Sequence, residues 1–489
     1  MVFADLIFIF AFLTLNLICY SLAKGIRAKN IVMVVFSLIF YSWSGPVYLL
    51  LMLGIVLLNW IFALLIDKSK TKGAAKFWMI ISCVVSLGAL GFFKYINFIV
   101  DNLKPLVDLS GFIPEILLPI GISFYTFQIL SYVIDVYRGD VPVQRSYWKL
   151  LLYVSLFHQC IAGPIVRYSD VSREITDRRV TGAEFSQGVT RFTVGLAKKA
   201  LLANVCAKVA DNILLTNAVA SDPTLLADNI SALAQKSAAL LWLGVLMYML
   251  QIYLDFSAYS DMAIGMGLMI GFHYKENFNY PYAAVSVTDF WRRWHISLSS
   301  FFRDYVYIPL GGNRRGLPRK IFNMLVVWFL TGLWHGASWN FVLWGLYFFV
   351  FLVIENIGWR DFLAKLPSVF GRVYLLIVVF FGWILFRFSQ MPLIWTVVKG
   401  LFCANGNSFF DFESNTIWLN YIFFVIVAII ACTPLAKGVN SFFARRSENS
   451  TAVAVIHGTV SVLIPIALLL LSTMALAGNS YNPFIYFRF

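Results

Sequence analysis

Residues 331–340 read TGLWHGASWN, a short stretch of small and polar residues set between two apolar runs, 321–333 and 341–353. The two runs predict consecutive membrane helices, and the stretch between them places His335 within membrane-type sequence. An imidazole is costly to bury there, so such a residue indicates a functional site. The small residues beside it would let neighbouring backbone approach the ring closely. The structural alternative is a histidine that only hydrogen-bonds between helices.

The composition identifies the class of protein. Of the 489 residues, 60% are hydrophobic and 13% are charged, and the mean hydropathy is +0.79. Soluble domains contain about 45–50% apolar and about 25% charged residues, which excludes a soluble domain. The alternation typical of a membrane β-barrel is absent. We therefore expect an all-α polytopic membrane protein with about 11–13 membrane helices plus re-entrant or interfacial helices.

Apolar runs of membrane length recur along the whole chain, which we interpret as one membrane domain, residues 1–489. Spans are expected at 3–22, 30–44, 47–66, 77–100, 119–137, 185–210, 234–271, 321–337, 338–358, 371–388, 416–436 and 455–477. Another run, 148–163, has basic residues beyond both ends, so we expect a re-entrant segment or a broken helix. No internal repeat of the transporter kind is evident.

The distribution of charge predicts the orientation. The formal net charge is +14, and the positive-inside rule places basic loops such as 272–320 in the cytoplasm. Lys199 is counted with the basic residues near the inner end of its span. Counting spans then puts the N-terminus and the tail, 478–489, outside the cytoplasm. The stretch 211–231 has three Asp and no Lys or Arg, which predicts an external loop.

A basic and aromatic segment, WRRWHISLS, occupies residues 291–299. Arg292 and Arg293 carry forked donors that suit phosphate groups, although ordinary anchoring at the cytoplasmic interface explains them equally well. Trp294 and His295 follow directly. This mixture would be expensive in a plain span and predicts an interfacial or re-entrant helix that lines a cavity.

Three further features bear on the site. Asp255 lies in an apolar span and needs a partner: it could orient a histidine, pair with an arginine, or form a structural salt bridge. His158 precedes the break at Gly163-Pro164 and is assigned a secondary, cavity-lining role. The six cysteines are scattered, without a CxxC pair, and no HExxH motif predicts a metal site.

Several long motifs resemble one family. They are DFSAYSDMAIGMGLMIGF at 255–272, ENFNYPY at 276–282, DFWRRWHISLSSFFRDYVYIPLGGNRRG at 289–316 and GLWHGASWNFVLWG at 332–345, with FHQCIAGPIVRY at 157–168 and PFIYFRF at 483–489. Together they resemble the membrane-bound O-acyltransferases, in particular the bacterial polysaccharide O-acetylases of the alginate and peptidoglycan type. The resemblance covers nearly the whole chain, with its catalytic core at 118–345.

The resemblance implies a ring of helices around a central cavity, open to a cytoplasmic acyl donor on one side and to an external acceptor on the other. By motif position, His335 would be the catalytic histidine and His295 its companion. Neutral imidazole is a suitable general base for a hydroxyl, since its pKa lies near the working pH. Donors for the developing oxyanion could come from Trp294 or another indole, from Ser297, from Asn340 or from the backbone.

The tail also resembles a C-terminal motif of related acyl-export systems, in which a tyrosine serves as an acyl relay. On that basis Tyr486 would accept the acyl group with His335 as base. A phenol with a pKa of about 10 needs such a base at neutral pH. The alternative is an anchor, with Tyr486 and Arg488 at the lipid headgroups and the phenylalanines in the acyl boundary.

The expected donor is acetyl-CoA, with no permanently bound cofactor and no metal. The expected partners are a separate extracytoplasmic acetyltransferase of the SGNH type, a polysaccharide acceptor and the lipid bilayer of a bacterial inner membrane, but no nucleic acid. Two other function classes stay open. One is a transporter or flippase that uses the polar cavity without chemistry, and the other is a scaffold of an exopolysaccharide synthesis complex.

Overall fold

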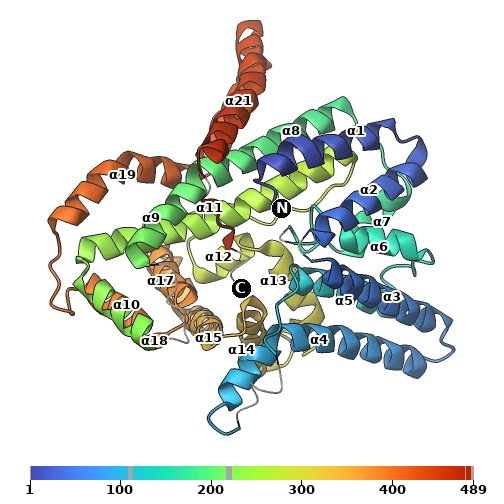
Figure 1. Cartoon of the computed structure of the whole chain (residues 1–489), viewed down its shortest axis with the longest axis horizontal. Coiled ribbons are helices and arrows are strands. Elements are labelled where there is room, and N and C mark those ends of the chain that lie inside the picture. The colour runs from blue at the N-terminus through green and yellow to red at the C-terminus, as the bar shows by residue number, and fades with distance from the viewer. Residues whose placement is uncertain are drawn as a thin grey trace. The chain divides into compact units, whose positions relative to one another are not determined.

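The structure, a computed structural model, describes residues 2–43, 45–107, 114–161, 163–215, 223–479 and 481–485. Helices dominate these residues, and no strand occurs among them (Figure 1), which confirms the all-α class. The chain packs as two compact units. Unit 1 comprises Met1–Leu196, Tyr259–Asn277 and Arg303–Tyr305, and unit 2 comprises Ala197–Ala258, Phe278–Phe302 and Val306–Phe489.

Unit 1 is built mainly from the first third of the chain. Its helices are η1 (Phe8–Leu13), α1 (Thr14–Leu22), α2 (Gly25–Ser42), α3 (Pro46–Lys68), α4 (Lys72–Leu103), α5 (Ile122–Arg138), α6 (Tyr147–Ser155), α7 (Tyr168–Thr176) and α8 (Gly182–Ala197). At nine residues α6 is too short to cross a bilayer, and the described residues between it and α7 form no helix. This confirms the broken helix expected at 148–163.

Unit 2 holds most of the remaining helices. They are η2 (Lys198–Ala203), α9 (Asn204–Leu214), α10 (Pro223–Gln235), η3 (Pro281–Ala283), α12 (Val287–Arg293), α13 (Ile296–Phe302), α14 (Gly316–His335), α15 (Trp339–Ile354), η5 (Glu355–Trp359), α16 (Arg360–Leu363), α17 (Ser368–Arg387), α18 (Met391–Leu401), α19 (Phe412–Ala431), α20 (Leu435–Ser447) and α21 (Thr451–Ala477). Three elements contribute residues to both units: α8 through its last residue, α11 (Ala238–Ile270) and η4 (Arg303–Tyr307).

The helix α11 is the most buried long helix of the chain. It runs for 33 residues without a break. At 1.5 Å per residue it is about 50 Å long, which exceeds a hydrocarbon core of about 30 Å. The span expected at 234–271 is therefore longer than one crossing needs, and its helix is continuous from Ala238 to Ile270. Because it is apolar all round, it suits a position inside the protein.

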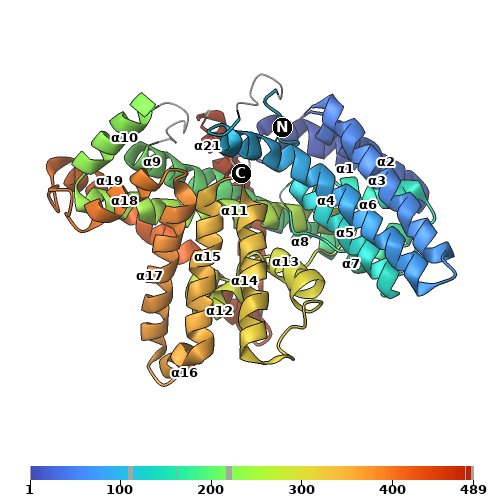
Figure 2. The same cartoon turned by 90° about the horizontal axis from the view of Figure 1, so that it is seen from below.

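Glycines determine how closely α14 and α15 pack. A Cβ added to Gly345 would lie 2.3 Å from the carbonyl oxygen of Trp328, and one on Gly332 would lie 2.5 Å from that of Phe341. Neither position tolerates a side chain without movement of backbone. Figure 2 shows α14, α15 and α17 as neighbouring rods, and α15 contacts both of the others. The small residues around His335 thus allow the close approach expected from the sequence.

Eight helices in the described part of the chain are long and apolar enough to cross a membrane. They are α2, α3, α4, α11, the continuous stretch Trp339–Leu363, α17, α19 and α21. The larger number expected from the sequence also counted shorter or more polar helices, such as Phe8–Leu22, α5 and α14. The chain is a multi-pass membrane protein.

One loop prediction is wrong in its secondary structure, while its place outside the cytoplasm stays a prediction. The stretch 211–231 was expected to be an external loop, but α9 extends to Leu214 and α10 begins at Pro223. The proline suits the first helical position, and α10 packs against α18. Asp211 is buried rather than exposed, because its carboxylate pairs with the guanidinium of Arg387 at 2.6 Å. Asp228 in α10 is exposed, so the acidic stretch indicated exposure for that residue but not for Asp211.

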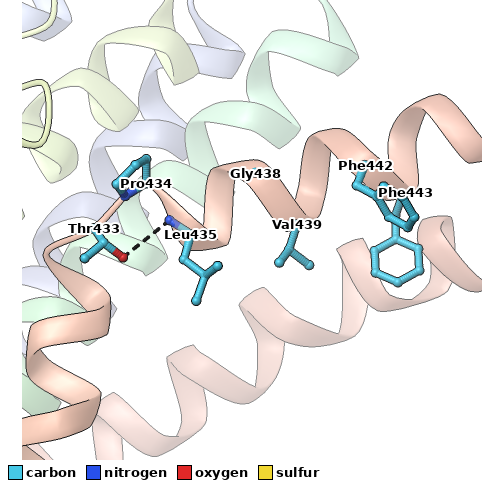
Figure 3. Close-up of a pocket in the computed structure, with 7 residues that line it drawn as sticks. All are labelled: Thr433, Pro434, Leu435, Gly438, Val439, Phe442 and Phe443. Atoms are coloured by element: carbon cyan, nitrogen blue, oxygen red, sulfur yellow. Dashed lines mark hydrogen bonds between the residues drawn. The ribbon is translucent and has the colours of Figure 1, made fainter. Parts of the chain in front are cut away.

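An apolar groove lies along the interfacial-type helix α20. Figure 3 shows Leu435, Val439 and Phe443 on one side of this helix, and all three are exposed. The last turn carries Arg445 and Arg446. An apolar face combined with basic residues is typical of a helix that lies at a membrane surface.

Candidate active site

His335 ends α14, and its ring is buried among aromatic side chains of unit 2. Its centroid lies 4.9 Å from Trp344 of α15 and 5.3 Å from Phe386 of α17, with edge-to-face geometry in both cases. The next residue, Gly336, has no room for a Cβ, which would lie 2.2 Å from the ring of Phe341. These contacts fix the orientation of the imidazole and exclude bulk water from its faces.

His295 lies in the connection between α12 and α13, in the same unit. Its backbone is left-handed, with φ of +44°, which is unusual for a residue with a Cβ and turns the chain sharply there. The buried ring lies 4.7 Å from Phe256 of α11, and its Nδ1 is 3.4 Å from the hydroxyl of Ser297.

Trp334 joins the two histidines. Its ring lies 5.0 Å from that of His335 and 5.7 Å from that of His295. Two imidazoles that are 40 residues apart in the sequence therefore share one indole as a neighbour. This geometry places His335 and its expected companion His295 against the same indole. Their catalytic roles stay a prediction.

A half-open cavity adjoins the residues that follow His335. Its volume is about 220 Å³, and its walls combine polar and apolar groups. They are formed by the turn Gly336, Ala337 and Ser338, by Asn340 and Phe341 of α15, by Phe386 and Arg387 of α17, and by Tyr248, Ser389 and Ile485. A small hydroxyl-bearing group fits such a space, with polar donors on the wall beside the imidazole.

The other residues expected near the site lie in different settings. Asn340 is buried in the first turn of α15 and donates to the carbonyl of Leu385 at 3.2 Å. Trp294 is buried in the core of unit 2, where its ring packs against Phe290. Arg293 pairs with Asp289 on its own helix at 2.9 Å, whereas Arg292 is exposed. Of the two arginines, Arg292 is the better placed for a ligand from solution.

The charged partner of Asp255 is a lysine rather than a histidine or an arginine. Its carboxylate lies 2.9 Å from the ammonium of Lys199, and both side chains are 1% exposed. Lys199 was expected near the inner end of its span, and its side chain is buried against Asp255 inside the protein. The second carboxylate oxygen of Asp255 accepts from the backbone N–H of Ile485 at 2.9 Å. Tyr486 follows directly but lies outside the described residues.

His158 belongs to unit 1. It is buried, with its Nδ1 3.4 Å from the hydroxyl of Tyr274 and its ring 4.1 Å from that of Phe157. Its cavity-lining role stays a prediction.

An arginine cluster surrounds Tyr305 in unit 1. Its hydroxyl donates to the carboxylate of Asp135 at 2.8 Å, while Arg138 and Arg167 lie over its ring at 5.1 and 5.2 Å. Arg167 also pairs with Asp304 at 2.7 Å. Burial raises the pKa of Asp304, but hydrogen bonds from Arg303 and Arg167 outweigh it and hold that pKa below its usual value.

Comparison with known proteins decides the family. The sequence profile of the membrane-bound O-acyltransferase family, MBOAT, matches residues 141–398, more than half of the chain. The chain belongs to this family. As an MBOAT protein it is an acyltransferase, and the matched range contains His158, His295 and His335. The tail lies outside that range.

Relatives from bacteria extend the match beyond the family profile. A probable alginate O-acetylase of Azotobacter vinelandii is 36% identical over 520 residues, covering 100% of both chains. A peptidoglycan O-acetyltransferase of Helicobacter pylori is 32% identical and covers 82% of this chain and 80% of its own. A teichoic acid D-alanyltransferase of Bacillus subtilis is 26% identical, over 55% of this chain and 67% of its own.

Sequence reasoning missed several residues of this MBOAT site. Phe386 and Arg387 close the cavity from α17, and Ile485 closes it from the tail, all outside the core expected at 118–345. Arg387 carried a usable signal, because an arginine at the end of an apolar span needs a partner. Phe386 gave no such signal in the sequence, since its span already contains several apolar and aromatic residues.

Proposed function

We propose that this MBOAT enzyme transfers acetyl groups from acetyl-CoA, bound on the cytoplasmic side, for O-acetylation of an extracytoplasmic polysaccharide. The names of the alginate and peptidoglycan relatives support an acetyl group and a polysaccharide acceptor. The observation that carries the proposal is the pair of buried imidazoles that share Trp334, with a partly polar cavity next to the turn that follows His335.

In the proposed reaction, His335 takes the proton of the acceptor hydroxyl as its oxygen attacks the thioester carbonyl. The tetrahedral intermediate then collapses, the carbon–sulfur bond breaks, and the proton passes to the coenzyme A thiolate. His295 positions or polarises the thioester. Asn340 lies on the cavity wall and is a candidate donor to the oxyanion.

The tail supplies a candidate acceptor. Residues 481–485 belong to unit 2, and Ile485 lines the cavity beside the turn that follows His335. Tyr486 is the next residue in the chain and would serve as the relay that carries acetyl to a separate SGNH-type transferase. Burial of Phe484 and Ile485 favours a docked tail over one anchored in lipid alone.

No permanently bound cofactor is required, and the polysaccharide and the bilayer of a bacterial inner membrane are the remaining partners. Arg292 and the cytoplasmic basic loops would meet the phosphates of coenzyme A. Both chain ends would be extracytoplasmic.

The purified protein in detergent, given radiolabelled acetyl-CoA, tests the function. We expect release of coenzyme A and transfer of label to the protein or to an added acceptor. A transporter or a scaffold would release none, and that result would reject the proposal. Activated D-alanine serves as a parallel donor, because the Bacillus subtilis relative is a D-alanyltransferase.

A further inference from the structure

We propose that two buried ion pairs of unit 2, Lys199–Asp255 and Arg387–Asp211, form a binding site for an extended peptide. In the structure this site is occupied by residues 481–485 of the chain itself. The ion pairs would act as positioning residues that hold the chain end against the cavity.

The first pair recognises the peptide backbone. Lys199 donates from its ammonium to the carbonyl oxygen of Pro483 as well as pairing with Asp255. Asp255 uses its other oxygen to accept the N–H of Ile485 at 2.9 Å. One ion pair thus binds both the carbonyl oxygen of Pro483 and the N–H of Ile485, two residues further along the chain. Because both groups belong to the backbone, this contact depends little on side-chain identity.

The second pair, Arg387–Asp211, binds the side chain of Tyr481, which lies four residues before Ile485 in the chain. Asp211 pairs with Arg387 through one oxygen and accepts the hydroxyl of Tyr481 through the other. As in the first pair, one carboxylate oxygen binds the cation and the other accepts a hydrogen bond from the peptide. Between the two pairs, the amide of Asn204 donates to Asn482 at 3.2 Å.

The cost of burying these charges supports a binding role. The side chains of all four residues are at most 5% exposed. Taking two charges out of water costs about as much as their attraction returns, so a buried ion pair stabilises a fold only weakly by itself. An ammonium has three donors and a carboxylate two acceptor oxygens. Without the peptide, the first pair would lose a partner at each of its charged groups.

The local helix geometry adds a separate argument. The helix from Gly182 to Leu214 is α-helical except for the π-helical turn η2, Lys198–Ala203. Such turns are rare and occur often at functional sites. This one carries Lys199 and is followed directly by Asn204, so two of the peptide's contacts come from the turn and its boundary. The helix α21, which leads to the tail, packs against η2.

Hydrogen exchange measured by mass spectrometry on the full chain tests the proposal. In Lys199→Met/Asp255→Leu the charges are replaced by apolar groups of similar size, which a purely structural pair would tolerate. We expect amide exchange in the C-terminal peptide, Ile485 included, to rise roughly tenfold or more, because a charge-assisted hydrogen bond is lost. Exchange elsewhere in unit 2 should stay near wild type. The amide exchange rate of the C-terminal peptide reports whether that peptide occupies the site, whichever group the enzyme transfers.

The chain offers a matched control. Arg191 and Asp261 form another ion pair between the same two helical segments, at 2.7 Å, and no contact of this pair involves residues 481–485 in the described structure. Arg191→Met/Asp261→Leu should leave exchange of the tail unchanged. An equal rise in this control would mean general loosening and would overturn the proposal.

A milder variant covers the case in which the double substitution does not fold. Tyr481→Phe removes only the hydroxyl that binds Asp211, so the protein should fold normally and tail exchange should rise severalfold. Wild-type exchange of the tail in this variant would reject the second half of the site. Wild-type exchange in Lys199→Met/Asp255→Leu would reject the first half.

Discussion

At the residue scale, His335 is held by Trp334, Trp344 and Phe386 at the end of α14. His335→Ala should lower acetyl transfer by at least ~100-fold, because general base catalysis contributes about 10²–10⁴-fold. Expression and membrane insertion should stay near wild type. The assay is label transfer from acetyl-CoA, and His457→Ala is the control, since His457 is partly exposed and its ring bonds only to Asn440 among the contacts described. Undiminished transfer by His335→Ala would refute the assignment.

Tyr486→Phe separates the relay from the anchor. The substitution keeps the ring and its packing but removes the hydroxyl that would accept the acetyl group. If the relay operates, acetylation of the polysaccharide should fall to background while tail exchange stays at the wild-type level. Polysaccharide analysis of cells that express the variant gives the measurement. Normal acetylation would leave the tail as an anchor only.

His273 gives a pH-dependent contribution to the stability of unit 1. Partial desolvation lowers its pKa, but hydrogen bonds to Glu174 and Glu184 outweigh this and raise the pKa above the usual 6.5. A raised pKa in the folded state means that the ion pairs stabilise fully below the unfolded pKa. The contribution is lost as pH rises through the folded value.

His273→Ala should therefore lower the melting temperature at pH 6 and have a much smaller effect at pH 9, as measured by thermal unfolding in detergent. Acetyl transfer should be nearly unchanged, because His273 is half exposed and lies in a different unit from His335. A destabilisation that grows as pH increases would contradict the sign of the shift.

At the scale of elements, the hairpin of α14 and α15 depends on glycine. Gly345→Ala would place a Cβ 2.3 Å from the carbonyl of Trp328, so the helices must separate. We expect a loss of stability of about 1–3 kcal/mol, typical of overpacking, together with reduced transfer as His335 shifts. Gly438→Ala in α20 is the control, because its Cβ would meet nothing within 4 Å. Equal melting temperatures for both variants would show that the hairpin tolerates separation.

At the scale of the whole molecule, acetyl transfer should depend on which face of the membrane acetyl-CoA can reach. In inside-out membrane vesicles the cytoplasmic face is accessible, so added acetyl-CoA should support transfer without detergent. Right-side-out vesicles should show activity only after permeabilisation, since coenzyme A is highly charged and does not cross bilayers. Equal activity in both preparations before permeabilisation would contradict the proposed orientation.

The sequence by itself determined the class of protein and most helices, and it singled out two histidines whose catalytic roles stay predictions. Apolar length and composition suffice for this, because a membrane segment must satisfy its backbone internally and therefore forms a helix. The runs around residues 331–340 gave α14 and α15 nearly as the structure has them. The motifs around His295 and His335 indicated a family that the comparison then confirmed.

Only the tertiary structure decided what the buried charges do. Lys199 was expected near the inner end of a span and Asp211 in an external loop, and both are buried in unit 2 beside opposite charges. A local pattern reports how polar a residue is, but not which distant residue neutralises it. The partners here lie 56 and 176 positions away, at Asp255 and Arg387, and such long-range pairing is set by how the helices pack.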